Sequence, residues 1–306
     1  MSRQTFDLTI LGSSSATPTA TRNPTSQLLN IAERFFLIDC GEATQIQLRR
    51  FKCKFQKIDH IFISHLHGDH FLGLPGLLAS MHLLGRKQEL CIYAPAALEE
   101  IISLINSQSD TMLNYPIRFI HTDDKGLNKL YEDQKVEVFS FPLKHRIKTT
   151  GFLFREKPAM RNIDKFKLEK HHVSLAEIHK LKMGEDAIAD DGRIIPNAEL
   201  TTDPLPPRSY AYCSDTLFHE EMADFIQHVD LLYHESTFLE DKKDRAKVTF
   251  HSTAMQAATM ARLAHAKQLV LGHFSARYGE LDDFLTEASG IFPQVELATE
   301  GKKISL

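Results

Sequence analysis

The segment His65-Leu66-His67-Gly68-Asp69-His70 places four potential metal ligands within six residues. It directly follows Ile58–Ile63, a short apolar run with β-branched residues that is typical of a buried strand. In an extended chain, residues i and i+2 point the same way, so the first two histidines can offer two imidazoles to one cation. Gly68 permits the turn that brings the last two ligands around. Imidazole and carboxylate together suit Zn²⁺ or a similar first-row metal, so we predict a metal site after this strand.

Three further candidate ligands follow other predicted strands. His145 follows Val136–Pro142, Asp215 follows Ala211–Ser214, and His273 follows Gln268–Gly272. Proteins of mixed α and β structure often build their sites at the carboxyl ends of strands. We therefore expect these three side chains to join the first loop, although each one alone is more often a capping or surface residue.

The rest of the chain predicts an α+β fold. Its first half contains predicted strands at Phe6–Leu11, Gln27–Ile31, Phe35–Ile38, Leu90–Tyr93, Ile117–His121 and Val136–Pro142, and helices at Ala43–Phe51, Pro75–Leu84 and Ala96–Ser107. Its second half contains predicted strands at Arg208–Ser214, Asp230–Tyr233, Gln268–Leu271 and Val295–Ala298, and helices at Phe218–His228, Thr253–His265 and Leu281–Ser289. Several strands followed by helices in each half favour two packed mixed layers over an alternating parallel sheet.

The composition is that of a globular protein. The chain has 306 residues with 42% apolar and 25% charged side chains, and its 36 Lys and Arg against 40 Asp and Glu give a net charge of −4. This charge argues against a protein whose whole surface grips nucleic acid. The four cysteines form no CxxC pair, and the chain contains no signal-peptide pattern or long apolar run. We expect reduced thiols, no membrane insertion and a cytoplasmic location.

The motifs resemble those of the metallo-β-lactamase superfamily and, within it, the ribonuclease Z family of tRNA 3′-processing endonucleases. The HxHxDH loop marks the superfamily, and the more specific segments are Phe36–Gln45 (FLIDCGEATQ), Gly73–Leu77 (GLPGL), His234–Thr237 (HEST), Phe250–Thr253 (FHST) and Gly272–Tyr278 (GHFSARY). These segments cover nearly the whole chain. The resemblance implies a four-layer αββα sandwich and two zinc ions per chain.

The resemblance also implies a role for each candidate ligand. One zinc is expected on His65, His67 and His145, the other on Asp69, His70 and His273, with Asp215 bridging both. A water between the two ions is the expected nucleophile, because zinc lowers the pKa of bound water to about 7. Asp69 is also expected to accept the proton of that water.

Two more residues carry expected catalytic roles. His251 resembles the group that protonates the departing 3′ oxygen, with Glu235 as the carboxylate that keeps its imidazole charged. The alternative for His251 is a structural residue at the entry of the helix that Thr253 begins. For Asp39, the sequence leaves open whether the carboxylate orients a ligand histidine or caps the helix at Ala43–Phe51.

The segment Arg155–Lys182 breaks the regular pattern and is predicted to be helical only in parts such as Ser174–Leu181. It carries eight basic and four acidic side chains, a local charge of +4. In the ribonuclease Z family an insertion at this place grips tRNA, so we expect residues 155–200 to form a protruding arm within a metallo-β-lactamase-like domain spanning 1–306, with precursor tRNA as its partner. The family also implies a homodimer in which the arm of one subunit serves the other. A solvated loop is the alternative for this segment.

The chain departs from the family at two places. His172-Val173-Ser174-Leu175 stands where a Gly-Pro step is expected, which leaves the arm's shape open. Ala20 stands where a lysine commonly helps to read the RNA 3′ end, so we expect weaker discrimination against tRNA ending in CCA. Two rival functions are a small-molecule hydrolase of the same fold (aryl sulfatase, lactonase or phosphodiesterase) and a silent RNA-binding scaffold.

Overall fold

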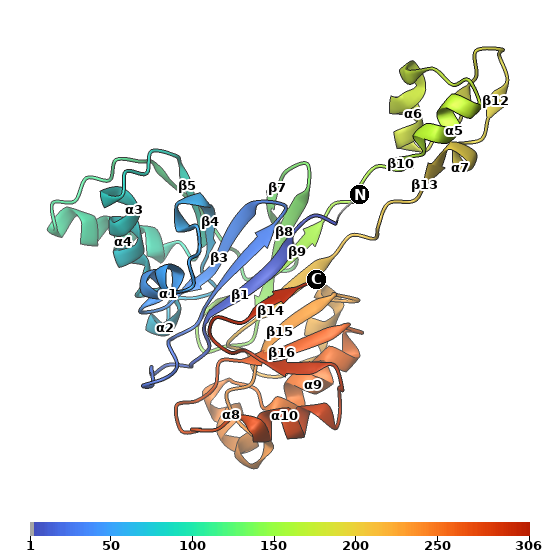
Figure 1. Cartoon of the computed structure of the whole chain (residues 1–306). Helices are drawn as coiled ribbons and strands as arrows, with labels where there is room; N and C mark the ends of the chain where they lie inside the picture. The colour runs from blue at the N-terminus through green and yellow to red at the C-terminus, as the bar shows by residue number, and fades with distance from the viewer. Residues whose placement is uncertain (1–2) are drawn as a thin grey trace. The chain divides into compact units, whose positions relative to one another are not determined.

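The computed structural model describes residues 3–306. The described chain divides into two compact units (Figure 1). One comprises Gln4–Arg155 and Arg208–Leu306, and we call it the site unit. The other contains Glu156–Pro207, and we call it the inserted unit.

The first sheet of the site unit has seven strands in the order β18-β1-β2-β3-β4-β5-β6. They are β1 (Phe6–Gly12), β2 (Ser26–Ile31), β3 (Arg34–Cys40), β4 (Ile58–Phe62), β5 (Leu90–Ala94), β6 (Ile117–His121) and β18 (Lys303–Ser305). Strands β1 to β3 and β18 pair antiparallel, whereas β3, β4, β5 and β6 pair parallel. The carboxyl ends of β3 and β4 therefore meet at one edge.

The second sheet also has seven strands, in the order β17-β16-β15-β14-β9-β8-β7. They are β7 (Asn128–Glu132), β8 (Val136–Leu143), β9 (Thr149–Glu156), β14 (Ser209–Cys213), β15 (Leu231–Glu235), β16 (Gln268–Gly272) and β17 (Val295–Leu297). Strands β14 to β17 are parallel to one another. Their carboxyl ends also share one edge, and the residues that follow them are candidate ligands.

The main core lies between the two sheets. Phe36 and Phe62 of the first sheet contact Phe152 and Phe154 of the second, with ring centroids 5.2–5.4 Å apart. The period-two alternation of a strand explains how the first sheet serves two cores. On β3, Phe36 faces the second sheet while its neighbour Leu37 packs in a separate outer cluster with helices.

Helices cover the outer face of each sheet, which gives the predicted αββα order (Figure 1). The first sheet is covered by α1 (Thr44–Arg50), α3 (Leu74–Leu83) and α4 (Ala97–Gln108), and the second by α9 (Ala254–Leu263) and α10 (Asp282–Ser289). Short elements complete the unit: α2 (Gly68–Phe71), α8 (Lys243–Thr249), η1 (Phe55–Lys57), η3 (Glu220–Phe225) and η4 (Glu240–Lys242). Thr253 and Gln256 form a capping box that begins α9. The predicted fold class is confirmed.

One local prediction was wrong. The predicted helix Phe218–His228 is only the 3₁₀ helix η3, because His228 adopts φ 58° and its N–H donates to the carbonyl of Ala264 instead of continuing the helix. Strand β7 was not predicted. That strand has no fully buried residue, so it lacks the apolar alternation that would reveal it.

The inserted unit has a small core of its own. Its elements are β10 (Asn162–Ile163), α5 (Lys165–Lys170), η2 (Leu175–Glu177), α6 (Ile178–Met183), β11 (Ala187–Ile188), β12 (Ile194–Ile195), α7 (Asn197–Leu200) and β13 (Thr201–Thr202). Leu168, Leu181 and Leu200 are buried together in this core. Asp164 caps the start of α5, and Gly184 ends α6 at φ 94°, a left-handed conformation that glycine adopts without strain.

Membrane-spanning helices are absent from the described part of the chain: none of its helices combines the length and the apolar character that a bilayer crossing requires.

Candidate metal centre

Five of the seven candidate ligands follow strands of the two sheets, and Asp69 and His70 belong to the short helix α2. His65 and His67 follow β4, His145 follows β8, Asp215 follows β14 and His273 follows β16. Asp215 and His273 adopt positive φ values of 61° and 59°. Such left-handed positions are uncommon for residues other than glycine and cluster at functional sites, where the surrounding structure holds them.

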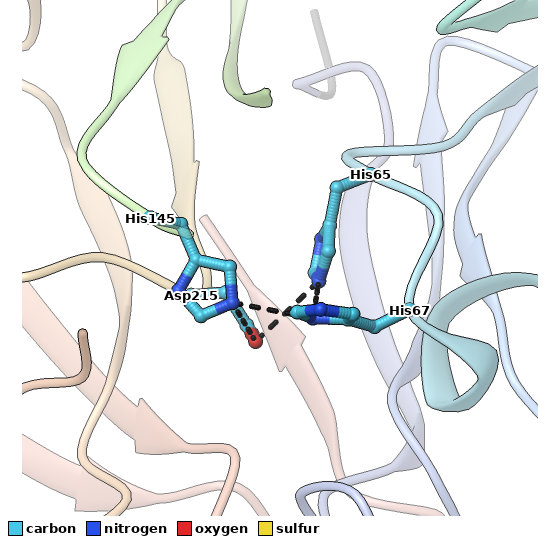
Figure 2. Close-up of side chains that lie close together, drawn as sticks. All are labelled: His65, His67, His145 and Asp215. Carbon is cyan, nitrogen blue, oxygen red and sulfur yellow. Dashed lines mark hydrogen bonds and ion pairs between the residues drawn. The ribbon is translucent and has the colours of Figure 1, made fainter. Parts of the chain in front are cut away.

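Four of these side chains form a first group of ligand atoms within 4.8 Å of one another: His65, His67, His145 and Asp215. Figure 2 shows His65 and His67 on one loop, facing His145 and Asp215 from two other loops. His67 Nδ1 lies 3.0 Å from His65 Nε2 and 3.2 Å from His145 Nε2. A second group of the same compactness consists of Asp69, His70 and His273.

The Asp215 carboxylate faces both groups with different oxygens. Its Oδ2 lies 3.5 Å from His65 Nε2 and 3.6 Å from His145 Nε2. Its Oδ1 lies 3.2 Å from His70 Nε2 and 3.0 Å from His273 Nε2. One carboxylate can thus contribute one oxygen to each of two cations.

Hydrogen bonds behind the imidazoles set which nitrogen faces the centre. His70 Nδ1 lies 2.7 Å from Asp39 Oδ2, and His145 Nδ1 lies 2.9 Å from the carbonyl of Phe250. In each contact the Nδ1–H donates a hydrogen bond to the oxygen, so the Nε2 lone pair faces the centre. Two other Nδ1 atoms have hydroxyl partners instead: His65 Nδ1 lies 3.0 Å from Ser64 Oγ, and His273 Nδ1 lies 3.0 Å from Thr237 Oγ1. This donor set of inward imidazole nitrogens and carboxylates fits zinc-type cations.

Asp39 holds the first-sheet side of the centre. Its carboxylate accepts from Ser64 N (2.8 Å), Ser64 Oγ (2.9 Å) and Tyr212 Oη (2.6 Å) in addition to His70. Helix α1 receives no side-chain cap and begins after Ala43. Of the two roles left open by the sequence, the structure supports the first: Asp39 contacts the candidate ligand His70 and does not cap α1.

Glu235 organises the second-sheet side. Its Oε1 lies 2.9 Å from His251 Nδ1 and accepts from Thr216 N at 2.7 Å, and its Oε2 accepts from Thr237 Oγ1 at 2.6 Å. Thr237 Oγ1 in turn lies 3.0 Å from His273 Nδ1. Sequence reasoning found Glu235 and His251 but missed the contacts of Ser64, Tyr212 and Thr237. The only feature of the sequence that could have indicated these three residues is that each lies next to or near a motif residue.

The electrostatics of the centre favour bound positive charge. Burial lowers the pKa of His65 and His145 and, together with neighbouring imidazoles, lowers that of His67 to about 4, so these rings are neutral and able to coordinate. Burial also lowers the pKa of His70, but the carboxylates of Asp215, Asp69 and Asp39 outweigh it and raise that pKa well above its usual value. The buried carboxylates therefore require a cation, which is a proton on His70 when no metal is bound.

His251 stands beside the ligands and is charged. Burial lowers its pKa, but the Glu235 carboxylate outweighs burial and raises the pKa of His251 to about 9. Its ring centroid lies 5.1 Å from that of His145 and 5.5 Å from that of His273. His251, Asp69 and Asp215 line one open cavity of about 320 Å³. A protonated imidazole next to two potential cation sites suits acid catalysis of a hydrolysis.

The αββα fold and the His/Asp cluster define a hydrolase of the metallo-β-lactamase fold that uses divalent metal. A family model described as "Anti-Pycsar protein Apyc1" matches residues 6–154. Ribonuclease Z of Cytophaga hutchinsonii is 48% identical over 297 residues, which cover 97% of this chain and 95% of that protein. Ribonuclease Z of Parabacteroides distasonis is 44% identical over 301 residues, covering 98% and 99%.

Among solved structures, human tRNase Z, short form, superposes with a TM-score of 0.69 at 29% identity, covering 98% of both chains. The metallo-β-lactamase fold protein YhfI from Bacillus subtilis gives a TM-score of 0.70 at 18% identity, covering 99% of this chain and all of the other, and supports the fold alone. The chain belongs to the ribonuclease Z family. Its predicted assignment to the metal-dependent endoribonucleases, with tRNA as substrate, is confirmed.

Proposed function

We propose that this chain holds two zinc ions and hydrolyses the phosphodiester after the discriminator region of precursor tRNA, which releases the 3′ trailer and leaves a 3′-OH on the tRNA. The observation that carries this proposal is the division of the Asp215 carboxylate between two groups of imidazoles, 3.0–3.6 Å away, beside the Glu235–His251 pair.

The ligand set would hold one ion on His65, His67 and His145 and the other on Asp69, His70 and His273, with Asp215 shared. When bound, such a metal pair lowers the pKa of a coordinated water and stabilises the attacking and leaving oxygens of an in-line displacement. The chain itself fixes the ligands through the Asp39 and Glu235 hydrogen bonds, so little reorganisation is needed as charge develops.

Proton transfer is assigned to Asp69 and His251. Asp69 Oδ2 is held by the N–H of Ala16 at 2.7 Å and lines the cavity, where it can accept the proton of the attacking water. His251 donates its proton to the departing 3′ oxygen of the tRNA. Glu235 holds the His251 ring in place and keeps it protonated near neutral pH.

Recognition of tRNA is assigned to the basic half of the inserted unit. Residues 155–182 carry eight basic and four acidic side chains, whereas residues 183–207 carry one arginine and six carboxylates. Arg161 and Lys180 are paired with carboxylates of the same unit. Lys165, Lys167 and Lys170 of α5 have no ion-pair partner within residues 3–306, which leaves them available to phosphates.

We further propose that two copies associate, with the inserted unit of one serving the site of the other, in the cytoplasm where precursor tRNA is processed. Exposed apolar side chains at the end of α3 and after α4 support an interface: Leu83 is 81% exposed, Leu84 54% and Met112 84%. Mixing an inactive site variant with an inactive inserted-unit variant tests the proposal. Recovered activity supports exchange between subunits, and no recovery from a mixed dimer contradicts it.

The direct test of the proposed function is cleavage of a 3′-extended tRNA by the purified zinc-loaded protein, with the product ends mapped. We expect a 3′-OH product that ends at the discriminator region. Hydrolysis of aryl sulfates or lactones without tRNA cleavage would support the small-molecule hydrolase. Binding of tRNA without any hydrolysis would support the scaffold.

A further inference from the structure

Arg146 lines the same cavity as the candidate ligands but belongs to neither ligand group. It directly follows His145 in the loop between β8 and β9. Ten residues line the cavity, and Arg146 is the single arginine or lysine among them. It is exposed, whereas the ligand His65 and the shared Asp215 are buried. The guanidinium therefore lies on the open side of the cavity.

Other cations near the centre are already engaged by the protein. Arg22 donates to the carbonyls of Tyr278 and Gly279, at 2.6 and 3.3 Å. In the same loop as Arg146, Lys144 pairs with Glu221 at 3.2 Å and Lys148 pairs with Asp124 at 3.5 Å. Arg146 has no hydrogen-bond or ion-pair partner within residues 3–306. It is the loop's cation that remains free to bind a ligand.

The backbone around Arg146 is fixed on both sides. His145 Nδ1 lies 2.9 Å from the carbonyl of Phe250, and Lys144 accepts from Leu217 N at 2.8 Å. Thr149 Oγ1 donates to the carbonyl of Ile147 at 3.0 Å. An anchored backbone reduces the conformational entropy that a guanidinium loses on binding.

We propose that Arg146 binds the non-bridging oxygens of the phosphate adjacent to the scissile one. This inference rests on the proposed function. The scissile phosphate must reach the buried ligands, so a cation on the exposed side of the cavity is placed for the next phosphate along the strand. A planar guanidinium can donate two parallel hydrogen bonds to one phosphate, which a lysine cannot reproduce. Arg146 is thus a positioning residue that sets which linkage lies at the ligands.

The test compares Arg146→Ala and Arg146→Lys with the matched control Lys148→Ala, which removes the same charge from the same loop. Metal content is measured for each variant, because Arg146 adjoins a ligand. On 3′-extended tRNA, we expect Arg146→Ala to lower kcat/KM about 10-fold or more, to scatter the cleavage position, and to reduce the salt dependence of binding by about 0.7 of a log–log unit. Arg146→Lys should restore the salt dependence but not the accuracy of cleavage. Lys148→Ala should behave as wild type.

A substrate with a single neutral methylphosphonate linkage next to the scissile phosphate locates the contact. On this substrate, the kcat/KM of the wild type should fall by the same factor by which Arg146→Ala lowers it on normal RNA. The kcat/KM of Arg146→Ala should fall little further when the linkage is made neutral. The proposal would be overturned if the neutral linkage and Arg146→Ala lowered kcat/KM independently of each other. It would also be overturned if Arg146→Ala and Lys148→Ala cleaved tRNA equally well. If the wild type cleaves no tRNA, the proposed function fails before Arg146 is tested.

Discussion

The site unit and the inserted unit differ in how their residues are constrained. In the site unit, Asp39 and Glu235 are fully buried and each holds several partners in fixed positions. In the inserted unit, the lysines of α5 lie mainly exposed around a small core. The side chains of the candidate metal centre depend on exact positions, and they stand in short sequence motifs. The lysines of α5 have no ion-pair partner among the described residues, and they are visible in the sequence only as an excess of positive charge. The following predictions separate the two.

The largest effect is expected for Asp215→Ala. This change removes the carboxylate whose two oxygens face the two ligand groups, so each bound ion would lose one oxygen ligand. We expect the wild type to bind two zinc ions and the variant fewer than one, a loss greater than the 10–100-fold in affinity that a supporting residue costs. Elemental analysis measures this, with Asp224→Ala on the exposed surface of η3 as the control. If the variant retains both ions, Asp215 is not a ligand shared between them.

His251→Ala should lose about 10²–10⁴-fold in tRNA cleavage while retaining its metals, because a positioned acid contributes that much. The loss should be smaller on a nitrophenyl phosphodiester, whose leaving group departs without a proton. His121→Ala, which removes an exposed histidine paired with Glu99, is the matched control. Equal losses on both substrates would make His251 a structural residue at the start of α9.

The pH dependence tests the Glu235–His251 pair. His251 has a pKa of about 9, raised from 6.5, so its charged form and the stabilisation it gains from Glu235 are fully present below pH 6.5 and lost as the pH rises through about 9. Activity should fall over the same alkaline range. Glu235→Gln removes the charge but leaves the burial, so the alkaline limb should move to lower pH. Both proteins are compared by their pH–rate profiles. If the alkaline fall in activity occurs at the same pH in Glu235→Gln as in the wild type, a group other than His251 causes it.

A smaller effect is expected for the triple variant Lys165→Ala, Lys167→Ala, Lys170→Ala in α5. If each lysine meets a phosphate, the salt dependence of tRNA binding should flatten by up to about 3 log–log units, while hydrolysis of a small phosphodiester is unchanged. A variant with Lys87, Lys125 and Lys135 replaced removes three exposed lysines from the site unit as the charge-matched control. If the two triple variants show the same salt dependence of tRNA binding, the proposal that α5 of the inserted unit binds tRNA phosphates is contradicted.

The sequence predicted the site unit well because its motifs and strands reinforce each other. The candidate ligands follow apolar runs such as Ile58–Ile63 that are typical of buried strands, so we could expect them to converge at the carboxyl ends of those strands. The hydrogen bonds of Tyr212 and Thr237 could not be predicted. Tyr212 reaches Asp39 in the other sheet, so its bond depends on how the two sheets pack, and the contact of Thr237 with His273 depends on how the loops after β15 and β16 lie. The left-handed backbone at Asp215 and His273 was also hidden, since neither position is a glycine.

The inserted unit was less predictable because a charge count depends on where the segment is taken to end. Residues 155–182 are strongly basic, but the folded unit continues to Pro207 and acquires six carboxylates after Met183. Its strands have two residues each and leave no periodic pattern. The sequence therefore indicated a tRNA-binding insertion through family resemblance and charge, and gave little information on its structure.

Anomalous diffraction at the zinc absorption edge, from crystals of the zinc-loaded protein, tests the shared-carboxylate site most directly. We predict two peaks, one among His65, His67 and His145 and the other among Asp69, His70 and His273, each within about 2.2 Å of an oxygen of Asp215. A single peak, or two peaks of which Asp215 contacts only one, would contradict the proposed shared position of Asp215.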